Sequence, residues 1–526
     1  MILNQYYLQI MKYLLSLFSL ILAIPSIGQD SLVKYSEIHF NSEFEKEVFH
    51  NYFKEGRDNY LALFMAVYPG IDQKQFTEYE QVYESNLNSL PLNKLGKKSP
   101  EKRVKVIYNE IHDSFLKKYE AQNHFSEIFA EGSYNCVSAS ALYGIVFSRL
   151  GIPFVIKEKP THVYLMAYPD TESLLVESTD PSGGFLDLND RAKTAFVAQM
   201  KKAKLISEQE FQLKTTEQLF DEYYFSDQNI DLKELVGIQY TNDALYHLEK
   251  GAYEKAYHQL EKSYLFYPAE KIVSLMVAVN VEHLQNSLYD DMKYIDYLSR
   301  LSRFEDYGIT PEMIISQFNR IIDLHLINKG NEKICEAYFD RFTSHVKDDK
   351  MREAVEYFYN YERGRILYNQ GRYAESLQFI EKAYKLKPEN LEVSSMFVGA
   401  LGQSLRFDLS NLTAIENLEK YQEQFPALLK NNRFRSLLVN AYLIQAGLSF
   451  DLGHITTAND NKSKFEMLYN RELNIDPRNI GRVYSLAAIY YFKKGHTKRA
   501  KGLLAKGLEY APGNHELLVR QRMVGN

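Results

Sequence analysis

The sequence predicts two parts, an α+β domain in the N-terminal half followed by an all-α array of helical repeats. Three observations carry this prediction. Segments of equal spacing recur within residues 237–526, three short apolar runs typical of strands follow a helix-like segment within residues 132–180, and a short apolar segment precedes both. With 526 residues, the chain is long enough for about three to four domain-sized units.

Residues 1–28 have the features of a secretory signal peptide. Lys12 precedes an apolar stretch of about a dozen residues, which is shorter than the ~20 residues that a membrane-spanning helix needs. Ser26 and Gly28 then supply the small residues typical of a cleavage site. We expect cleavage after Gly28, with Met11 as an alternative start, and an exported protein in the periplasm or outside the cell. After cleavage we expect no membrane span; an uncleaved anchor is the alternative.

The composition excludes several classes of protein. Lys and Arg number 62 against 68 Asp and Glu, a net charge of −6, and no long basic block occurs, so we expect no nucleic-acid partner. The only cysteines are Cys136 and Cys335, which excludes a disulfide-built scaffold. We find no Cys/His spacing for zinc, no phosphate loop and no dinucleotide motif. We therefore expect no cofactor and no metal.

The repeats are clearest in three segments that end at Pro268, Pro388 and Pro512. Counted back from each proline, small residues or glycines recur 24, 17, 12 and 5 residues earlier. They are Ala244, Gly251, Ala256 and Ser263 in the first segment, Gly364, Gly371, Ser376 and Ala383 in the second, and Ala488, Gly495, Ala500 and Gly507 in the third. Small residues let two helices approach closely, glycine suits the turn between them, and proline ends the second helix.

This pattern resembles the tetratricopeptide repeat (TPR), a helix–turn–helix unit of about 34 residues. The resemblance implies a TPR solenoid over residues 237–526, with about six or seven helical pairs, that binds a protein or peptide partner. Degenerate copies are expected between the clear ones. They span 270–302, 310–346, 391–426 and 433–477.

The candidate chemistry lies in the N-terminal half, after a mostly helical stretch over residues 31–130. The pattern predicts a turn over 132–136 and a helix over 137–150 that ends at Gly151-Ile152-Pro153. Three strands are then expected, over residues 154–157, 162–168 and 174–179.

Four pieces of this region resemble the transglutaminase-like superfamily. They are Asn135-Cys136, the helix end Leu150-Gly151-Ile152-Pro153, the strand start Thr161-His162-Val163 and the strand end Val176-Glu177-Ser178-Thr179. The resemblance is tight over residues 132–180 and extends loosely over 31–230. It implies an α+β transglutaminase-like N-terminal domain followed by an all-α TPR solenoid. The implied site is papain-like, as in cysteine proteases, with Cys136, His162 and an acid as its catalytic residues.

Two departures from the family pattern concern the residues around the histidine. Tyr164 stands where the family commonly has tryptophan. The acid is Glu177 or its rival Asp180, because Asp180 keeps the family's Asp-Pro string three residues later. A hairpin centred on Tyr168–Thr171 places His162 opposite Glu177, whereas one centred on Asp170–Glu172 places it opposite Asp180. We favour Glu177, because an apolar run leads directly into it.

These residue types suit acyl-thioester chemistry. A helix N-terminus and a neighbouring imidazolium both stabilise a thiolate, which attacks a carboxamide while His162 protonates the leaving amine. Asn135 or the Cys136 backbone N–H is the candidate oxyanion donor. The sequence therefore predicts an exported thiol enzyme that hydrolyses or transfers amide bonds of peptides or proteins. The alternative is a catalytically inactive scaffold for protein–protein interaction in the cell envelope.

Overall fold

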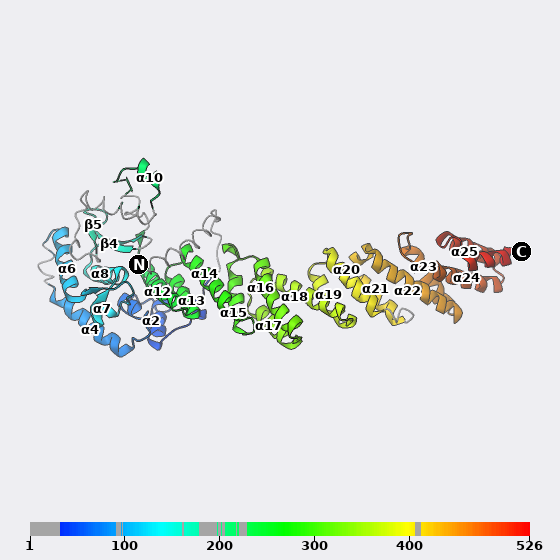
Figure 1. Ribbon diagram of the computed structural model, residues 1–526, viewed down its shortest axis with the longest axis horizontal. Coiled ribbons are helices and arrows are strands. Elements are labelled where there is room, and N and C mark those ends of the chain that lie inside the picture. The colour runs from blue at the N-terminus through cyan, green and yellow to red at the C-terminus, as the bar shows by residue number, and fades with distance from the viewer. Residues whose placement is uncertain are drawn as a thin grey trace. The chain divides into compact units, whose positions relative to one another are not determined.

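The computed structural model describes residues 32–90, 96, 98–159, 162–177, 197, 201, 206–216, 218–219, 229–405 and 412–525 (Figure 1). The predicted signal peptide and the rival acid Asp180 lie outside these residues. The described chain is mostly helical, with small sheets in its N-terminal half. It divides into two compact units, Met1–Leu288 and Tyr289–Asn526, which are treated separately below.

The first unit surrounds one long buried helix, α8 (Cys136–Leu150), with other helices and a small sheet. Its remaining main helices are α2 (Glu43–Phe53), α3 (Tyr60–Met65), α4 (Gln73–Ser89), α6 (Pro100–Phe115), α7 (Glu127–Ala130), α10 (Glu208–Leu213), α12 (Leu232–Glu249), α13 (Tyr253–Phe266) and α14 (Glu270–Asn286). Most side chains of α8 are buried, as its small and apolar composition predicts.

The predicted strands form an antiparallel sheet in the order β5-β4-β3-β6. Its strands are β3 (Phe154–Lys159), β4 (His162–Ala167), β5 (Leu174–Val176) and β6 (Asn229–Ile230). In the β4–β5 register Leu165 pairs with Val176, so both predicted hairpin registers were wrong. A second, parallel pair, β1 (Lys118–Tyr119) and β2 (Ser133–Tyr134), was not predicted; β2 lies in the expected turn.

The end of α8 explains the Leu-Gly-Ile-Pro string on which the resemblance partly rests. Gly151 has a φ of +65°, a left-handed conformation that glycine adopts without strain. The Ile152 amide then donates to the Phe147 carbonyl at 2.9 Å, which closes a Schellman-type cap. Pro153 cannot continue the helix, and its carbonyl accepts from Tyr168 at 2.8 Å. The string therefore turns the chain directly from α8 into the sheet.

The first predicted repeat packs within the N-terminal unit. Helix α12 contacts α13 as a repeat pair, and it also contacts α3 and α8. The division between compact units falls after α14, beyond the predicted domain boundary near residues 230–237. The first repeat therefore belongs to the repeat array by its sequence pattern but to the N-terminal unit by its packing.

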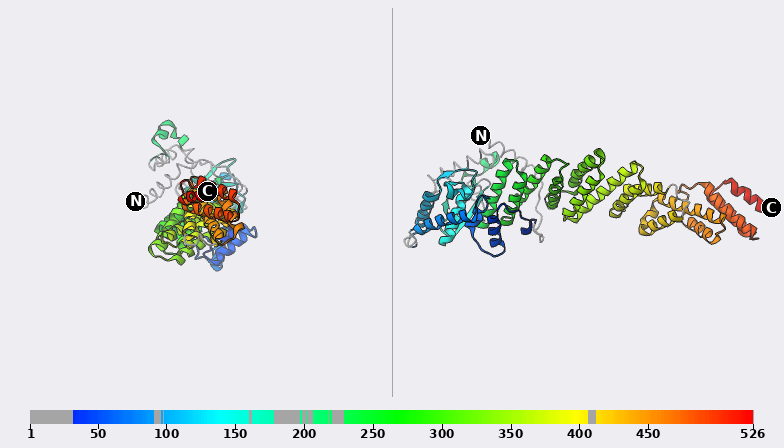
Figure 2. Two further views of the ribbon diagram at one scale, coloured as in Figure 1. Left: turned by 90° about the vertical axis from the view of Figure 1, so that its right-hand side faces the viewer. Right: turned by 90° about the horizontal axis from the view of Figure 1, so that it is seen from below.

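The second unit consists of consecutive helices that pack against their neighbours in sequence (Figures 1 and 2). They are α15 (Lys293–Leu301), η2 (Ser302–Tyr307), α16 (Pro311–Ile321), the π-helix η3 (Ile322–Asn328), α17 (Glu332–His345), α18 (Asp349–Asn369), α19 (Tyr373–Leu386), α20 (Leu391–Ser404), α21 (Leu412–Gln424), η4 (Pro426–Lys430), α22 (Asn432–Asp451), α23 (Ile455–Leu468), α24 (Pro477–Lys493), α25 (Thr497–Tyr510) and α26 (His515–Gly525).

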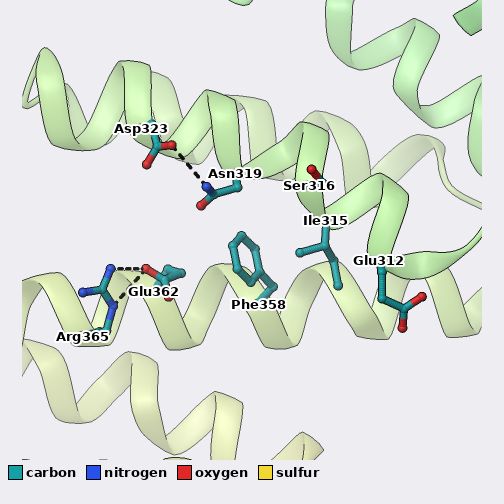
Figure 3. A pocket seen from close by; sticks show the side chains of 8 residues that line it. All are labelled: Glu312, Ile315, Ser316, Asn319, Asp323, Phe358, Glu362 and Arg365. Atoms are coloured by element: carbon teal, nitrogen blue, oxygen red, sulfur yellow. Dashed lines mark hydrogen bonds and ion pairs between the residues drawn. The ribbon is translucent and has the colours of Figure 1, made fainter.

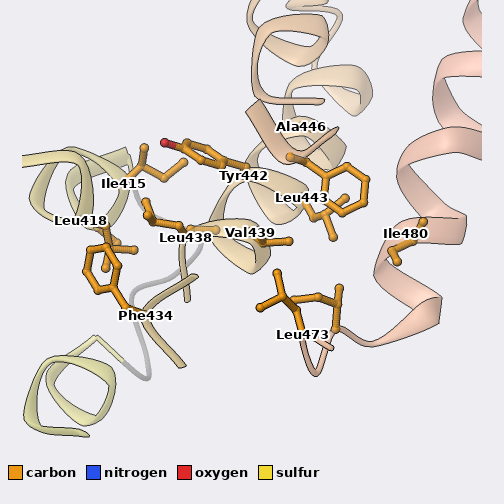
Figure 4. Packing of buried hydrophobic residues seen from close by; sticks show 14 of the residues in the cluster. Ile415, Leu418, Phe434, Leu438, Val439, Tyr442, Leu443, Ala446, Leu473 and Ile480 are labelled. Atoms are coloured by element: carbon orange, nitrogen blue, oxygen red, sulfur yellow. The ribbon is translucent and has the colours of Figure 1, made fainter. Parts of the chain in front are cut away.

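One continuous cluster of buried apolar side chains runs from Ile380 in α19 to Leu517 in α26. Figure 4 shows part of it, where Leu438 and Val439 of α22 lie between Leu418 of α21 and Ile480 of α24. Each helix thus buries its apolar face against its neighbours and not in a separate globular centre, which is the packing expected of repeats.

The repeat turns share one geometry. Gly251, Gly371 and Gly495, the predicted turn glycines, have φ values of +68°, +77° and +79°. Gly453, between α22 and α23, has a φ of +80° and shows a fourth copy with the same turn. This copy has Asn470 where the others have proline, which is why the sequence pattern placed it only among the degenerate copies.

One buried position of the repeat differs between copies. It lies 25 residues before the proline and is Asp243 in the first copy, Arg363 in the second and Ala487 in the third, all buried. Asp243 contacts His124 at 2.8 Å. Arg363 forms an ion pair with Glu332 of α17.

Replacing Gly364 with alanine is expected to lower the free energy of unfolding by about 1–3 kcal/mol. A Cβ at Gly364 would collide with the buried Ile380 side chain and press on the Ile380 amide nitrogen. The matched control is Gly502→Ala in α25, where a Cβ meets open space; this change should stabilise the chain by up to ~1 kcal/mol. Urea unfolding measures both, and equal stabilities for the two variants would contradict the predicted close helix approach.

Candidate active site

Cys136 is the first residue of α8, and it is partly exposed. Asn135 caps the helix: its side chain accepts from the Ser138 amide at 2.9 Å, and the Ser138 hydroxyl accepts from the Asn135 amide at 2.9 Å. The Ser138 hydroxyl also donates to Asn123 at 2.7 Å. This buried network fixes the helix start, so the sulfur lies at the positive end of the helix dipole.

Strand β4 brings His162 to the start of the same helix. The Ser140 hydroxyl, one turn after Cys136, donates to the Val163 carbonyl at 3.3 Å and fastens α8 to β4 next to His162. Burial acts to lower the pKa of His162, but hydrogen bonds with Cys136 and Glu177 and their negative charges raise it to about 10. The sulfur and the imidazole, 26 residues apart in the sequence, thus interact directly.

Glu177 is the acid that meets His162. Its carboxylate Oε2 lies 2.8 Å from His162 Nε2, which leaves Nδ1 as the ring nitrogen for the sulfur. Extending the observed β4–β5 register places Glu177 across from Tyr164, so it is a diagonal neighbour of His162 on the same face. The longer side chain of glutamate spans this diagonal.

Two tyrosines support the pair. The Tyr108 hydroxyl donates to the Glu177 backbone carbonyl at 3.0 Å, and the buried Tyr164 ring stacks on His162 at a centroid distance of 6.1 Å. Tyr164 therefore packs beside the imidazole at the place where the family commonly has tryptophan.

The side chain of Asn135, the candidate oxyanion donor, is engaged elsewhere. Its Oδ1 caps Ser138, and its Nδ2 donates to the Ala121 carbonyl at 3.2 Å. These contacts make Asn135 a positioning residue for Cys136, and its oxyanion role stays a prediction. The backbone N–H of Cys136, in the first turn of α8, remains the alternative donor.

The sequence did not point to Tyr119. The β1–β2 register sets it beside Tyr134, two residues before Cys136, and the two rings meet edge to face at 5.8 Å. Burial first, then the charges of Cys136 and Glu177, raise the pKa of Tyr119 to about 12, so its hydroxyl stays protonated at neutral pH. About half of the side chain is exposed. Tyr119 is recognised as a neighbour of Cys136 only from the pairing of β1 with β2.

The second cysteine, Cys335, belongs to the second unit. It is buried in α17, and burial raises the pKa of its thiol to about 11. His112 of α6 stacks on Tyr108 at a centroid distance of 5.8 Å, and burial lowers the pKa of its imidazole. Among the described residues, no group of three or more His, Cys, Asp or Glu side chains is arranged to hold a metal ion. Nor does any described helix combine the length and apolarity needed to cross a membrane.

Comparison with known families identifies one segment. The tetratricopeptide repeat family matches residues 352–390. This range contains most of α18, all of α19 and the whole second repeat with its terminal Pro388. A TPR segment is therefore confirmed at the place where the spacing predicted it, and it indicates protein–protein interaction. A search among curated proteins gives no match.

Proposed function

We propose that the protein is an exported, transglutaminase-like cysteine enzyme that acts on amide bonds of peptides or proteins. The observation that carries this proposal is the contact of His162 with both Cys136 and Glu177 at the N-terminus of α8. A thiol, an imidazole and a carboxylate in this order form the minimal set for acyl transfer through a thioester. In this proposal the TPR part binds a protein partner. It either brings the partner to the thiol domain as a substrate or positions the thiol domain on its target.

In the proposed mechanism each of these residues has a role. The Cys136 thiolate attacks the carbonyl carbon of a carboxamide, forming a C–S bond and an oxyanion next to the first turn of α8. The His162 imidazolium donates its proton to the amine as the C–N bond breaks. In the second half, neutral His162 removes a proton from water or an acceptor amine, which attacks the thioester and releases Cys136. Glu177 holds the imidazole in place throughout.

The pattern of residues 1–28 supports export, because it combines a basic residue, a short apolar stretch and small residues at the expected cleavage site. Edman or mass-spectrometric sequencing of the secreted chain should give Gln29 as the first residue. An intact N-terminus in the membrane fraction would favour the anchor.

Turnover is tested with the chain from residue 29 onward and a library of glutamine-containing peptides, with and without an added alkylamine. Hydrolysis or amine incorporation should be detected by mass spectrometry. Cys136→Ala should reduce it by at least about a thousandfold, whereas Cys335→Ala should retain it. Product formation that survives Cys136→Ala would contradict the proposed nucleophile.

The alternative function is an inactive scaffold, in which the thiol domain has lost catalysis and the repeats bind another chain. The family match to an interaction repeat favours it. It predicts no turnover by the wild-type chain and no covalent adduct on Cys136 with peptide electrophiles, while the partner still binds.

A further inference from the structure

The second unit contains a groove between α16 with the following η3 and α18. Figure 3 shows side chains from the two helical segments pointing into it, and its volume is about 490 Å³. Residues at helical spacing line each side: Glu312, Ile315, Asn319 and Asp323 on one and Phe358, Glu362 and Arg365 on the other. Each side is therefore one continuous helix face.

The groove is acidic at both ends, and its middle is lined by uncharged side chains that include Ile315 and Phe358. Glu312 and Asp323 lie at opposite ends, with the Phe358 ring between them (Figure 3). Arg365 is the one cation of the lining, and its guanidinium is engaged by Glu362 on the same helix, at 3.0 Å from Nε. The carboxylates of Glu312 and Asp323 thus set the charge at its ends.

Both end carboxylates are oriented by their own helix. Hydrogen bonds from its own backbone N–H and from Thr310, and then the charge of Lys387, lower the pKa of Glu312. The Asp323 carboxylate accepts a hydrogen bond from the side-chain amide of Asn319 at 3.2 Å. Asp323 belongs to η3, which is a π-helix. Such turns are less stable than α-helix and frequently occur at functional sites.

We infer that this groove binds an extended segment of a partner protein that carries two cationic side chains four residues apart. The end carboxylates are 11 residues apart on a helical segment, which corresponds to about 16 Å along its axis. In an extended chain, residues four apart point to the same face and lie about 13 Å apart, and long cationic side chains can span the remaining few ångströms. An apolar side chain between the two cations would lie on Phe358.

This inference rests on the partner-binding role proposed for the TPR part, and it is independent of the thiol chemistry. The probe is a fluorescein-labelled peptide, Gly-Lys-Ala-Phe-Ala-Lys-Gly, whose two lysines and phenylalanine share one face of the extended chain. It is titrated with the full chain at low salt and followed by fluorescence anisotropy. The wild-type chain should bind it, and the combined change Glu312→Gln and Asp323→Asn should weaken binding about tenfold. Added salt should weaken wild-type binding as well.

The matched control removes the same charge from α17, by Glu336→Gln and Asp340→Asn, two exposed residues outside the groove. Binding should stay within about twofold of wild type. Equal weakening by both double variants, equal affinity for a peptide with glutamate in place of lysine, or no binding at millimolar wild-type chain would each overturn the inference. Alkylation of Cys136 in the same samples should not change, which separates this outcome from failure of the catalytic proposal.

Discussion

Replacing His162 with alanine is expected to slow alkylation of Cys136 by iodoacetamide at pH 7 about tenfold. An isolated thiol has a pKa of about 8.5, so only a few per cent is thiolate at pH 7. In the wild-type chain, hydrogen bonding and charge interaction with Cys136 contribute to the raised pKa of His162, so at neutral pH the imidazole carries a positive charge beside the thiol. A neighbouring cation favours the thiolate form of a cysteine. Loss of that cation should disfavour the thiolate, and the greater nucleophilicity of a more basic thiolate offsets part of this loss.

The effect of His162→Ala on the alkylation rate should depend on pH. Since the pKa of His162 is raised to about 10, the imidazolium persists through neutral pH and is lost only as the pH approaches that value. The difference in rate between the wild-type chain and His162→Ala should therefore be present at neutral pH and should disappear as the pH rises through about 10.

Cys335 is the internal control, because it is buried and burial raises the pKa of its thiol to about 11. Peptide mass spectrometry follows both thiols in one sample. If Cys136 in the wild-type chain labels no faster than Cys335, or if His162→Ala leaves the profile unchanged, the thiol is not activated and the enzymatic proposal fails.

Replacing Glu45 with glutamine is expected to lower the free energy of unfolding by about 3–5 kcal/mol. Glu45 of α2 and Lys262 of α13 form an ion pair at 2.7 Å with both side chains fully buried. The Tyr240 hydroxyl donates to the same carboxylate at 3.0 Å. Without the carboxylate, the buried ammonium of Lys262 loses its ion-pair partner and keeps only the weaker attraction of Asp243 and Glu261.

The loss of stability in Glu45→Gln should become smaller as the pH rises. Burial lowers the pKa of Lys262 below its ordinary value, and removal of Glu45 deepens that shift. The variant therefore carries its full penalty while Lys262 is charged, and the deficit narrows as the pH rises toward about 10.4. Urea unfolding at pH 7 and pH 9.5 measures this difference.

The matched control lies two residues away on the same helix. Glu43 pairs with Lys46 at 3.4 Å with both side chains exposed, so Glu43→Gln should change stability by less than about 1 kcal/mol. A Glu45→Gln variant no less stable than Glu43→Gln would show that the buried pair adds nothing to the first unit.

Features with local causes could be predicted from the sequence. The end of α8 was predicted because Gly151 and Pro153 act on the backbone within a few residues. The repeat at 352–390 was predicted because small residues and a proline recur at fixed spacing. The three strands that follow α8, which are β3, β4 and β5, were predicted because each is a short apolar run between turn residues.

Features that depend on pairing between distant segments could not be predicted from the sequence. The hairpin register came out between the two expected ones, since the turn residues Tyr168 and Ser173 adopt positive φ values that no local rule required. Tyr119 reaches the site through a parallel pairing with β2. The capping role of Asn135 was overlooked, although asparagine is one of the residues favoured at a helix N-cap.

The buried repeat position occupied by Asp243, Arg363 and Ala487 affects whether the repeat copies can be interchanged. Asp243 faces a histidine and Arg363 faces a glutamate, so the two copies present opposite charges at equivalent places. Exchanging the two copies would place Arg363 beside His124 and Asp243 beside Glu332, and we expect such a change to lower stability, because a buried charge would lose its partner. The third copy has no such constraint, since Ala487 at the same position is uncharged.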